Sequence, residues 1–149
     1  MKKAIALLLA LVMVFALCAC GGGGDSASGD KVVKIGVFEP ASGDSGAGGK
    51  KEMLGMQYAN QETPTVEIGG ETYKVELVYS DNGSDSAKAV SAASKLVNEK
   101  VSLVLGSYGS GVSIAASDTF KQAGIPAIGV TCTNPNVTAG NSHYFRICF

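Results

Sequence analysis

Short strand-like runs alternate with segments of helical periodicity from Lys31 to the end of the chain. Strands are expected at 31–38, 73–81, 101–105, 125–130 and 144–149, and helices at 53–60, 86–99 and 112–123. This β-α-β-α-β-α-β-β order predicts the α/β class, with an open, mostly parallel sheet, right-handed crossovers and helices on both faces.

The helix expected at 86–99 has the clearest pattern. Its apolar residues recur at spacings of three and four and so form one face: Ala89, Val90, Ala93, Leu96 and Val97. Ser84 and Asp85 precede this segment and offer an N-cap. Gly124 is expected to end the following helix.

The first twenty residues, MKKAIALLLALVMVFALCAC, have the composition of a secretory leader. The uncharged run Ala4–Ala16 is shorter than the roughly 20 residues that span a bilayer. Leu17 to Cys20 resembles the lipobox of bacterial lipoproteins. That resemblance implies removal of residues 1–19, lipidation of Cys20 and an anchor on the outer face of the membrane. Gly and Ser dominate 20–30, which is typical of a linker.

The composition of the chain limits the class of protein to which it can belong. With 46% hydrophobic and 17% charged residues, the 149-residue chain is too apolar for disorder and long enough for about one domain, placed at 31–149. A net charge of −1 gives no electrostatic argument for binding nucleic acid.

Three polar turns follow predicted strands: EPASGDSGAGG, GSYGSG and TCTNP. Ligands of open parallel sheets lie beyond the carboxyl ends of the strands, so these turns predict a binding cleft. Their glycines and serines do not match the spacing of a phosphate loop, a dinucleotide fingerprint or a nucleophile elbow.

Groups able to transfer protons are scarce in these turns. The single histidine, His143, is expected to be a loop residue, and no carboxylate pair is expected at these strand ends. Two cysteines in the mature region, Cys132 and Cys148, are too few for a metal site. The sequence therefore predicts a site that binds without reacting, with no enzyme activity, cofactor or metal.

An ordered set of segments carries a family resemblance: KIGVFEPASGDSGAGG, VELVYSDNGSD, LVLGSYGSGVSIAASDTFKQAGIPAIGVTCTNPNVT and YFRICF. Over roughly 34–149 the chain is similar to the N-terminal lobe of periplasmic branched-chain-amino-acid binding proteins. These are the extracytoplasmic receptors of ABC importers, with the type I periplasmic-binding-protein fold. The resemblance implies an amino acid or similar small ligand and permease subunits as partners.

The resemblance also implies a ligand set in the last two polar turns. Ser110 would bind the ligand carboxylate through its hydroxyl and its N–H. Thr133 would help to hold the carboxylate and the ammonium, and the Thr131 carbonyl would accept from the ammonium. Cys132 lies between them in the same turn. A carboxylate is well served by N–H donors at the start of a helix.

Some positions depart from the family pattern. Gly48 stands where an aromatic residue commonly covers the ligand side chain, which is expected to leave room for a larger or more polar ligand. A family disulfide cannot form because its positions hold Gly83 and Gly109. Cys132 and Cys148 could form a disulfide or remain free thiols.

The family closes two lobes of similar size around its ligand. We therefore expect this chain to be a fragment that binds amino acids weakly or not at all when alone. Two alternatives are a sensor of the same fold that presents its ligand to a membrane receptor, and a flavodoxin-like enzyme or flavin carrier. The lipobox and Asp44 in the first turn argue against the flavin hypothesis.

Overall fold

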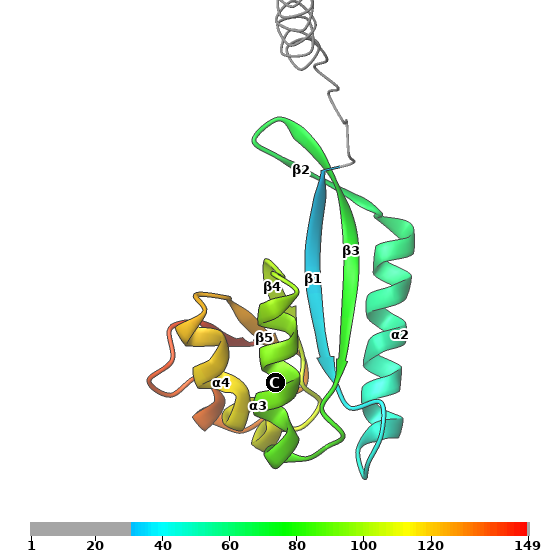
Figure 1. The fold of residues 1–149 in the computed structure, drawn as a ribbon. Helices are drawn as coiled ribbons and strands as arrows, with labels where there is room; N and C mark the ends of the chain where they lie inside the picture. Colours follow the sequence, from blue (N-terminus) through cyan, green and yellow to red (C-terminus); the bar gives the residue numbers. More distant parts are fainter. Residues whose placement is uncertain (1–30, 149) are drawn as a thin grey trace, which may run out of the picture.

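The computed structural model describes residues 31–148, which form a sheet flanked by helices (Figure 1). Within this range the six strands lie in the order β2-β3-β1-β4-β5-β6. The strands are β1 (Val32–Glu39), β2 (Thr65–Ile68), β3 (Glu71–Asp81), β4 (Leu103–Leu105), β5 (Ala127–Gly129) and β6 (Tyr144–Arg146). The helices are α2 (Gly46–Glu62), α3 (Ser86–Asn98) and α4 (Ser110–Gln122), with a 3-10 turn at Pro135–Val137.

All neighbouring strands pair in parallel except β2, which runs antiparallel to β3. In the centre of the sheet, Gly36 of β1 pairs with Val78 of β3 and Val104 of β4. The predicted open, mostly parallel sheet is therefore confirmed, and the antiparallel strand sits at its edge.

Two features of the first half differ from the sequence-based prediction. β2 and β3 form a hairpin through a two-residue turn at Gly69 and Gly70. The φ angles of these glycines are 62° and 81°, and residues with a side chain adopt such positive values only at an energetic cost. The helix expected at 53–60 begins much earlier, at Gly46. The four glycines of its first ten residues weakened the helical pattern but did not prevent the helix.

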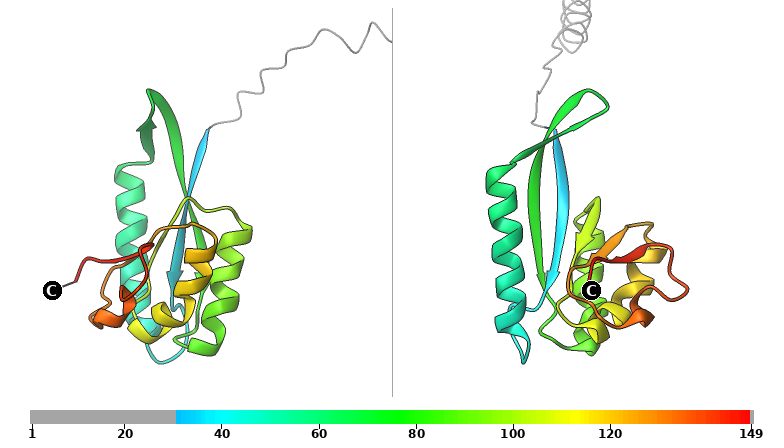
Figure 2. Two further views of the ribbon diagram at one scale, coloured as in Figure 1. Left: turned by 90° about the vertical axis from the view of Figure 1, so that its left-hand side faces the viewer. Right: turned by 180° about the vertical axis from the view of Figure 1, so that it is seen from behind.

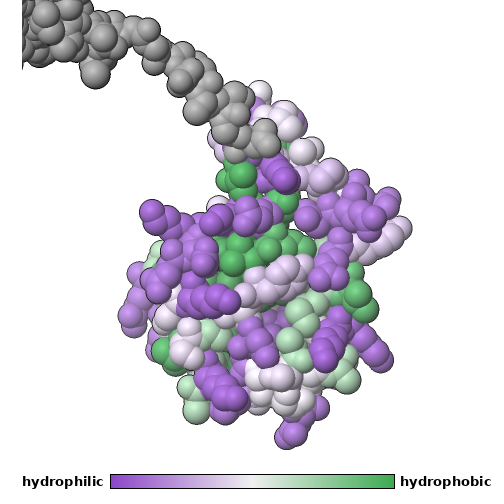
Figure 3. Space-filling model, turned by 45° about the vertical axis from the view of Figure 1, so that its right-hand side comes forward, coloured by the Kyte–Doolittle hydropathy of each residue, from purple (hydrophilic) through white to green (hydrophobic). Residues whose placement is uncertain are grey.

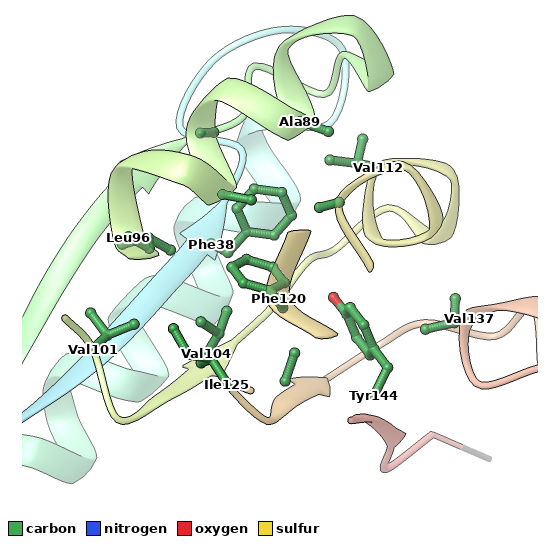
Figure 4. Packing of buried hydrophobic residues seen from close by; sticks show 14 of the residues in the cluster. Phe38, Ala89, Leu96, Val101, Val104, Val112, Phe120, Ile125, Val137 and Tyr144 are labelled. Carbon is green, nitrogen blue, oxygen red and sulfur yellow. The ribbon is translucent and has the colours of Figure 1, made fainter. Parts of the chain in front are cut away.

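Helices cover both faces of the sheet, as predicted. α3 and α4 lie on one face and α2 lies on the other (Figure 2). On the α3/α4 face, Phe38 and Phe120 meet edge to face with their ring centroids 5.4 Å apart (Figure 4). The buried cluster around them includes Ala89, Ala93, Leu96, Val101, Val104, Val112, Ala116 and Tyr144. The apolar face predicted for α3 is thus confirmed, apart from Val90, which is 49% exposed.

The α2 face is less closely packed. It contains an apolar hollow of about 420 Å³ between α2, the sheet and β2. Its lining includes Val33, Ile35, Met56, Ala59, Leu77, Leu103 and Leu105. In Figure 3 apolar residues gather close to the start of β1, with hydrophilic residues around them.

Several predictions fall on residues 1–30, outside the described range. These are the signal peptide at 1–19, the lipidated Cys20 and the linker at 20–30. Among residues 31–148, no helix combines the length and the apolar character needed to cross a membrane.

Candidate functional site

The polar turns after β1, β3, β4 and β5 meet at one edge of the sheet, as the topology requires. Asp81, at the end of β3, ties the first two together by accepting hydrogen bonds from Ser42 Oγ at 2.7 Å and from the N–H groups of Ala41 and Gly83 at 2.8 Å. Burial works in the opposite direction, but these hydrogen bonds lower the pKa of Asp81.

The turn after β4 is fixed by contacts with β1, β5 and β6. Gly106 has a φ of 119°, and a Cβ there would lie 2.2 Å from the Phe38 carbonyl oxygen, so the close approach to β1 requires glycine. Its N–H donates to Ile128 O at 2.9 Å, and its carbonyl accepts from the Tyr144 hydroxyl at 2.8 Å. Burial raises the pKa of Tyr144, which keeps this donor protonated.

The start of α4 points unpaired donors into a small hollow. The first backbone bond at this end joins the Ser113 N–H to Gly109 O, so the N–H groups of Ser110, Gly111 and Val112 have no acceptor within residues 31–148. Gly111 and Val112 line a hollow of about 210 Å³ together with Pro40, Ser45, Ser84, Ser86, Ser107 and Gly109. Free N–H groups and hydroxyls favour an anionic group such as a carboxylate.

Ser110 is the first residue of α4, two residues before the predicted start of the helix. Its hydroxyl does not cap the helix, since the N-cap is Gly109 and makes no side-chain bond. Instead, Ser110 Oγ accepts a hydrogen bond from the Asn134 N–H at 3.2 Å. Ser110 therefore joins the turn after β4 to the turn after β5.

The turn after β5 presents two of its three candidate side chains. Thr131 and Thr133 are exposed, whereas Cys132 is fully buried. The Cys132 thiol donates to Ser107 O at 3.0 Å and contacts Ser113 Oγ at 3.1 Å, and burial raises its pKa. The Cys132 side chain thus supports the turn from within the core. Cys132 and Cys148 are both free thiols.

Tyr108 occupies the space beside Gly48. A Cβ on Gly48 would lie 2.6 Å from ring atoms of Tyr108, so the ring packs directly over the glycine. The Tyr108 ring thus occupies the space that a side chain at position 48 would take, while the expectation that Gly48 leaves room for a larger ligand stays a prediction. The two residues, with Asp44, Lys51 and Glu52, line an open hollow of about 600 Å³.

A carboxyl pair lies behind this turn, although the sequence was interpreted as having none at the strand ends. Glu39 ends β1, is 1% exposed and lies beside the carboxyl of Glu52 in α2. Burial first, and then the hydrogen bond and charge of Glu52, raise the pKa of Glu39 to about 9. Each carboxyl also accepts a hydrogen bond from one of the polar turns, Glu39 from the Tyr108 N–H and Glu52 from the Thr131 hydroxyl.

The other predictions about chemistry concern His143 and metals. His143 lies in the loop before β6, where its ring contacts Ser142 Oγ at 3.2 Å. Among the described residues, no three His, Cys, Asp or Glu side chains are grouped so that they could hold a metal ion.

The sequence-based interpretation missed Glu39, Glu52, Tyr108 and Arg146. Arg146 donates to the carbonyls of Cys132 at 3.2 Å and Thr133 at 2.9 Å, which fixes the turn after β5 from β6. One signal was available: Glu39 is an acid directly after an apolar strand run, at the strand end where function was expected. Its pairing with Glu52 depends on how α2 packs, which no local pattern reveals.

Comparison with known proteins agrees with this fold. Residues 32–147 match the family described as periplasmic binding protein. An amino acid binding protein from Pseudomonas aeruginosa is 36% identical over 119 residues, covering 78% of this chain and 31% of the relative. A Leu/Ile/Val-binding protein homolog from Brucella abortus is 34% identical over 127 residues, covering 84% of this chain and 33% of the relative.

Solved structures show the same likeness. The leucine binding protein LivK from Thermotoga maritima superposes with a TM-score of 0.73 at 36% identity, covering 79% of this chain and 33% of that one. The branched-chain amino acid transporter substrate binding protein LivJ from Streptococcus pneumoniae, in complex with isoleucine, superposes with a TM-score of 0.69 at 33% identity. This match covers 78% of this chain and 33% of that one. The chain spans about a third of the length of these relatives. They are binding proteins rather than enzymes, as predicted, and the resemblance to branched-chain-amino-acid binding proteins is confirmed: the chain belongs to the periplasmic binding protein family.

Proposed function

We propose that the chain is a ligand-binding lobe of the extracytoplasmic substrate-binding component of an ABC importer for amino acids of the branched-chain type or a related small molecule. The observation that carries this proposal is the unpaired N-terminus of α4. Gly111 and Val112, whose N–H groups are free, line a hollow that also includes serine residues. The Ser110 hydroxyl joins this helix end to the turn that carries the exposed Thr131 and Thr133. A small zwitterion needs a binding site with hydrogen-bond donors for its carboxylate and carbonyl acceptors for its ammonium.

The proposed ligand contacts are those that the family resemblance implies, and the arrangement of the turns supports them. Ser110 donates its N–H and hydroxyl to the carboxylate, which leaves its Oγ lone pair for the Asn134 N–H. Thr133 assists at the carboxylate and the ammonium, and the Thr131 carbonyl accepts from the ammonium. Cys132 holds the two threonines in place from the core. The Tyr108 ring, 43% exposed over Gly48, covers the ligand side chain.

The family implies a location outside the cytoplasm. The proposal adds an anchor: residues 1–19 are removed as a signal peptide, Cys20 is lipidated and 20–30 tethers the lobe to the membrane. Two acyl chains on one residue suffice for stable attachment. The permease subunits of the importer are the proposed protein partners.

Nuclear magnetic resonance can test the ligand site even if affinity is low. Titrating the ¹⁵N-labelled chain with L-isoleucine is expected to shift the amide resonances of Gly109 to Val112 and of Thr131 to Asn134. Ser110→Ala should weaken binding by about 1 to 3 kcal/mol, the value of a hydrogen bond to a charged group.

Ser94→Ala serves as the matched control, because the Ser94 hydroxyl donates to Val90 O within α3, away from these turns. It is expected to leave the titration unchanged. Isoleucine-induced shifts confined to other parts of the lobe, or full affinity in Ser110→Ala, would contradict the proposed site.

A further inference from the structure

Two acidic side chains each hold one residue of the proposed ligand turns. Glu39 Oε2 accepts a hydrogen bond from the Tyr108 N–H at 2.8 Å, in the turn after β4. Glu52 Oε1 accepts from the Thr131 hydroxyl at 2.6 Å, in the turn after β5. The acids come from β1 and α2, so the contacts fasten both turns to two other elements.

The two carboxyl groups also approach each other, since the side chain and the charge of Glu52 act on Glu39. Within residues 31–148, Glu39 Oε1 and Glu52 Oε2 are buried without a hydrogen-bond partner, and one proton shared between them would satisfy both oxygens. Two carboxyl groups can hydrogen-bond only if one of them is protonated. Without the proton, two buried negative charges would repel each other across this contact.

With a proton shared between Glu39 and Glu52, a chain of hydrogen bonds would run from one ligand turn to the other, through the Tyr108 N–H, the two carboxyls and the Thr131 hydroxyl. The Thr131 hydroxyl also lies 3.4 Å from Tyr108 O, which closes the chain into a ring. The proton shared by Glu39 and Glu52 makes this set of contacts depend on pH.

We propose that Glu39 and Glu52 are positioning residues that share one proton near neutral pH and set the spacing of the two ligand turns, so that ligand affinity falls when the pair becomes fully ionised. The inference rests on the proposed function, because it concerns the same turns. It assigns a role to two residues that touch no ligand.

Other titratable groups face the pair from each neighbouring element. Cys132 and Tyr144 approach Glu39 from the core side, and burial raises the pKa of both. Burial thus favours the neutral forms of both groups, while the pKa of the Glu39 carboxyl lies near 9. On the solvent side, Asp44 and Lys51 line the same hollow as Glu52. The Tyr108 ring lines that hollow too, so Glu39→Gln, which keeps all of these neighbouring groups, isolates the effect of the carboxyl pair.

Isoleucine titrations at pH 6 and pH 10 test the proposal. The dissociation constant of the unaltered chain is expected to rise about fivefold or more, the size of a typical coupling between sites. Glu39→Gln keeps an acceptor for the Tyr108 N–H and gains an amide donor toward Glu52. It should match the unaltered chain at pH 6 within about twofold and keep at pH 10 only the smaller loss that comes from deprotonation of the isoleucine ammonium. Glu39→Leu removes both links and should bind weakly at both values.

A measurement without ligand separates this inference from the proposed function. The Tyr108 amide resonance should titrate with pH in the unaltered chain and in the surface control Glu76→Gln, but not in Glu39→Gln. If isoleucine does not bind, this titration still supports or overturns the shared proton. Equal affinity at pH 6 and pH 10 in the folded chain, or unchanged pH dependence in Glu39→Gln, would show that the pair does not position the turns.

Discussion

Strand β1 shows two different environments on its two faces. Toward α3 and α4, Phe38 is fully buried, and a Cβ on Gly36 would meet side chains at 3.1 to 3.2 Å. Toward α2, Val33 and Ile35 are only partly buried and border an apolar hollow, while Glu39 is buried against another acid. Alternate residues of one strand thus meet a closed core and a looser layer.

The two faces therefore have different roles: the α3/α4 face stabilises the fold, and the α2 face can change its packing. Close packing leaves few alternative arrangements on the α3/α4 face, so that face fixes the sheet. The α2 face combines unfilled space with a hydrogen bond that depends on a proton, and it is the face that contacts the ligand turns through Glu39 and Glu52. Four predictions test this comparison.

The largest effect is expected from removing an aromatic ring on the closed face. Phe38→Ala deletes a fully buried side chain that packs against Phe120, and should lower the free energy of unfolding by about 4 kcal/mol. Ile35→Ala, on the same strand but toward the hollow, should cost about 1 kcal/mol, since its side chain is already partly exposed. Urea denaturation measures both. Equal losses would mean that the two faces are packed alike.

The second prediction concerns pH. The ordinary pKa of Glu39 is 4.5, and burial beside Glu52 raises it to about 9. Between these values the folded chain keeps a proton that the unfolded chain has lost, so the free energy of unfolding should fall as pH rises. One such proton changes stability by about 1.4 kcal/mol per pH unit, or about 2.7 kcal/mol between pH 6 and pH 8.

Urea midpoints at pH 6, 7 and 8 measure this slope. Glu39→Gln should flatten it, and the exposed Glu76→Gln should retain it. The low pKa of Asp81 affects stability only in acid, as its stabilising ionised form is lost when pH falls, outside this window. A stability that rises from pH 6 to pH 8 would contradict the assignment of the shared proton.

The two faces also differ in how well the sequence predicts them. The apolar spacing in 86–99 and the capping residue Asp85 predicted α3, and the alternation of elements predicted the parallel sheet. The α2 layer was predicted poorly, because glycines obscured the start of the helix and the Gly69-Gly70 turn of the hairpin was overlooked. Within the site, the strand-end turns were visible as polar segments. The burial of Cys132, the Tyr108 ring over Gly48 and the carboxyl pair depend on contacts between distant segments.

Adding atoms should have opposite consequences on the two faces. Gly36→Ala places a methyl group against Leu96, Val101 and Val104, and should cost about 1 to 2 kcal/mol through overpacking. Ala59→Leu extends from α2 toward the hollow and should be neutral or stabilise by up to about 1 kcal/mol. Thermal and urea unfolding report both changes. Destabilisation by Ala59→Leu comparable to that by Gly36→Ala would show that the hollow cannot accept a side chain.

The smallest expected difference lies in the helix caps of the two layers. Asp85 caps α3 by accepting from the Ala87 N–H at 2.7 Å, whereas Ser45, at the start of α2, makes no side-chain cap. Asp85→Ala should therefore cost about 1 kcal/mol, because it leaves the Ala87 N–H without an acceptor and removes a negative charge from the start of the helix. Ser45→Ala should change stability by about 0.3 kcal/mol or less, as the hydroxyl satisfies no N–H of α2. Both are measured by urea denaturation at pH 6, where the carboxyl pair keeps its proton. If Ser45→Ala cost as much as Asp85→Ala, the start of α2 would depend on a cap as strongly as α3 does, and the contrast between the layers would not extend to their helix ends.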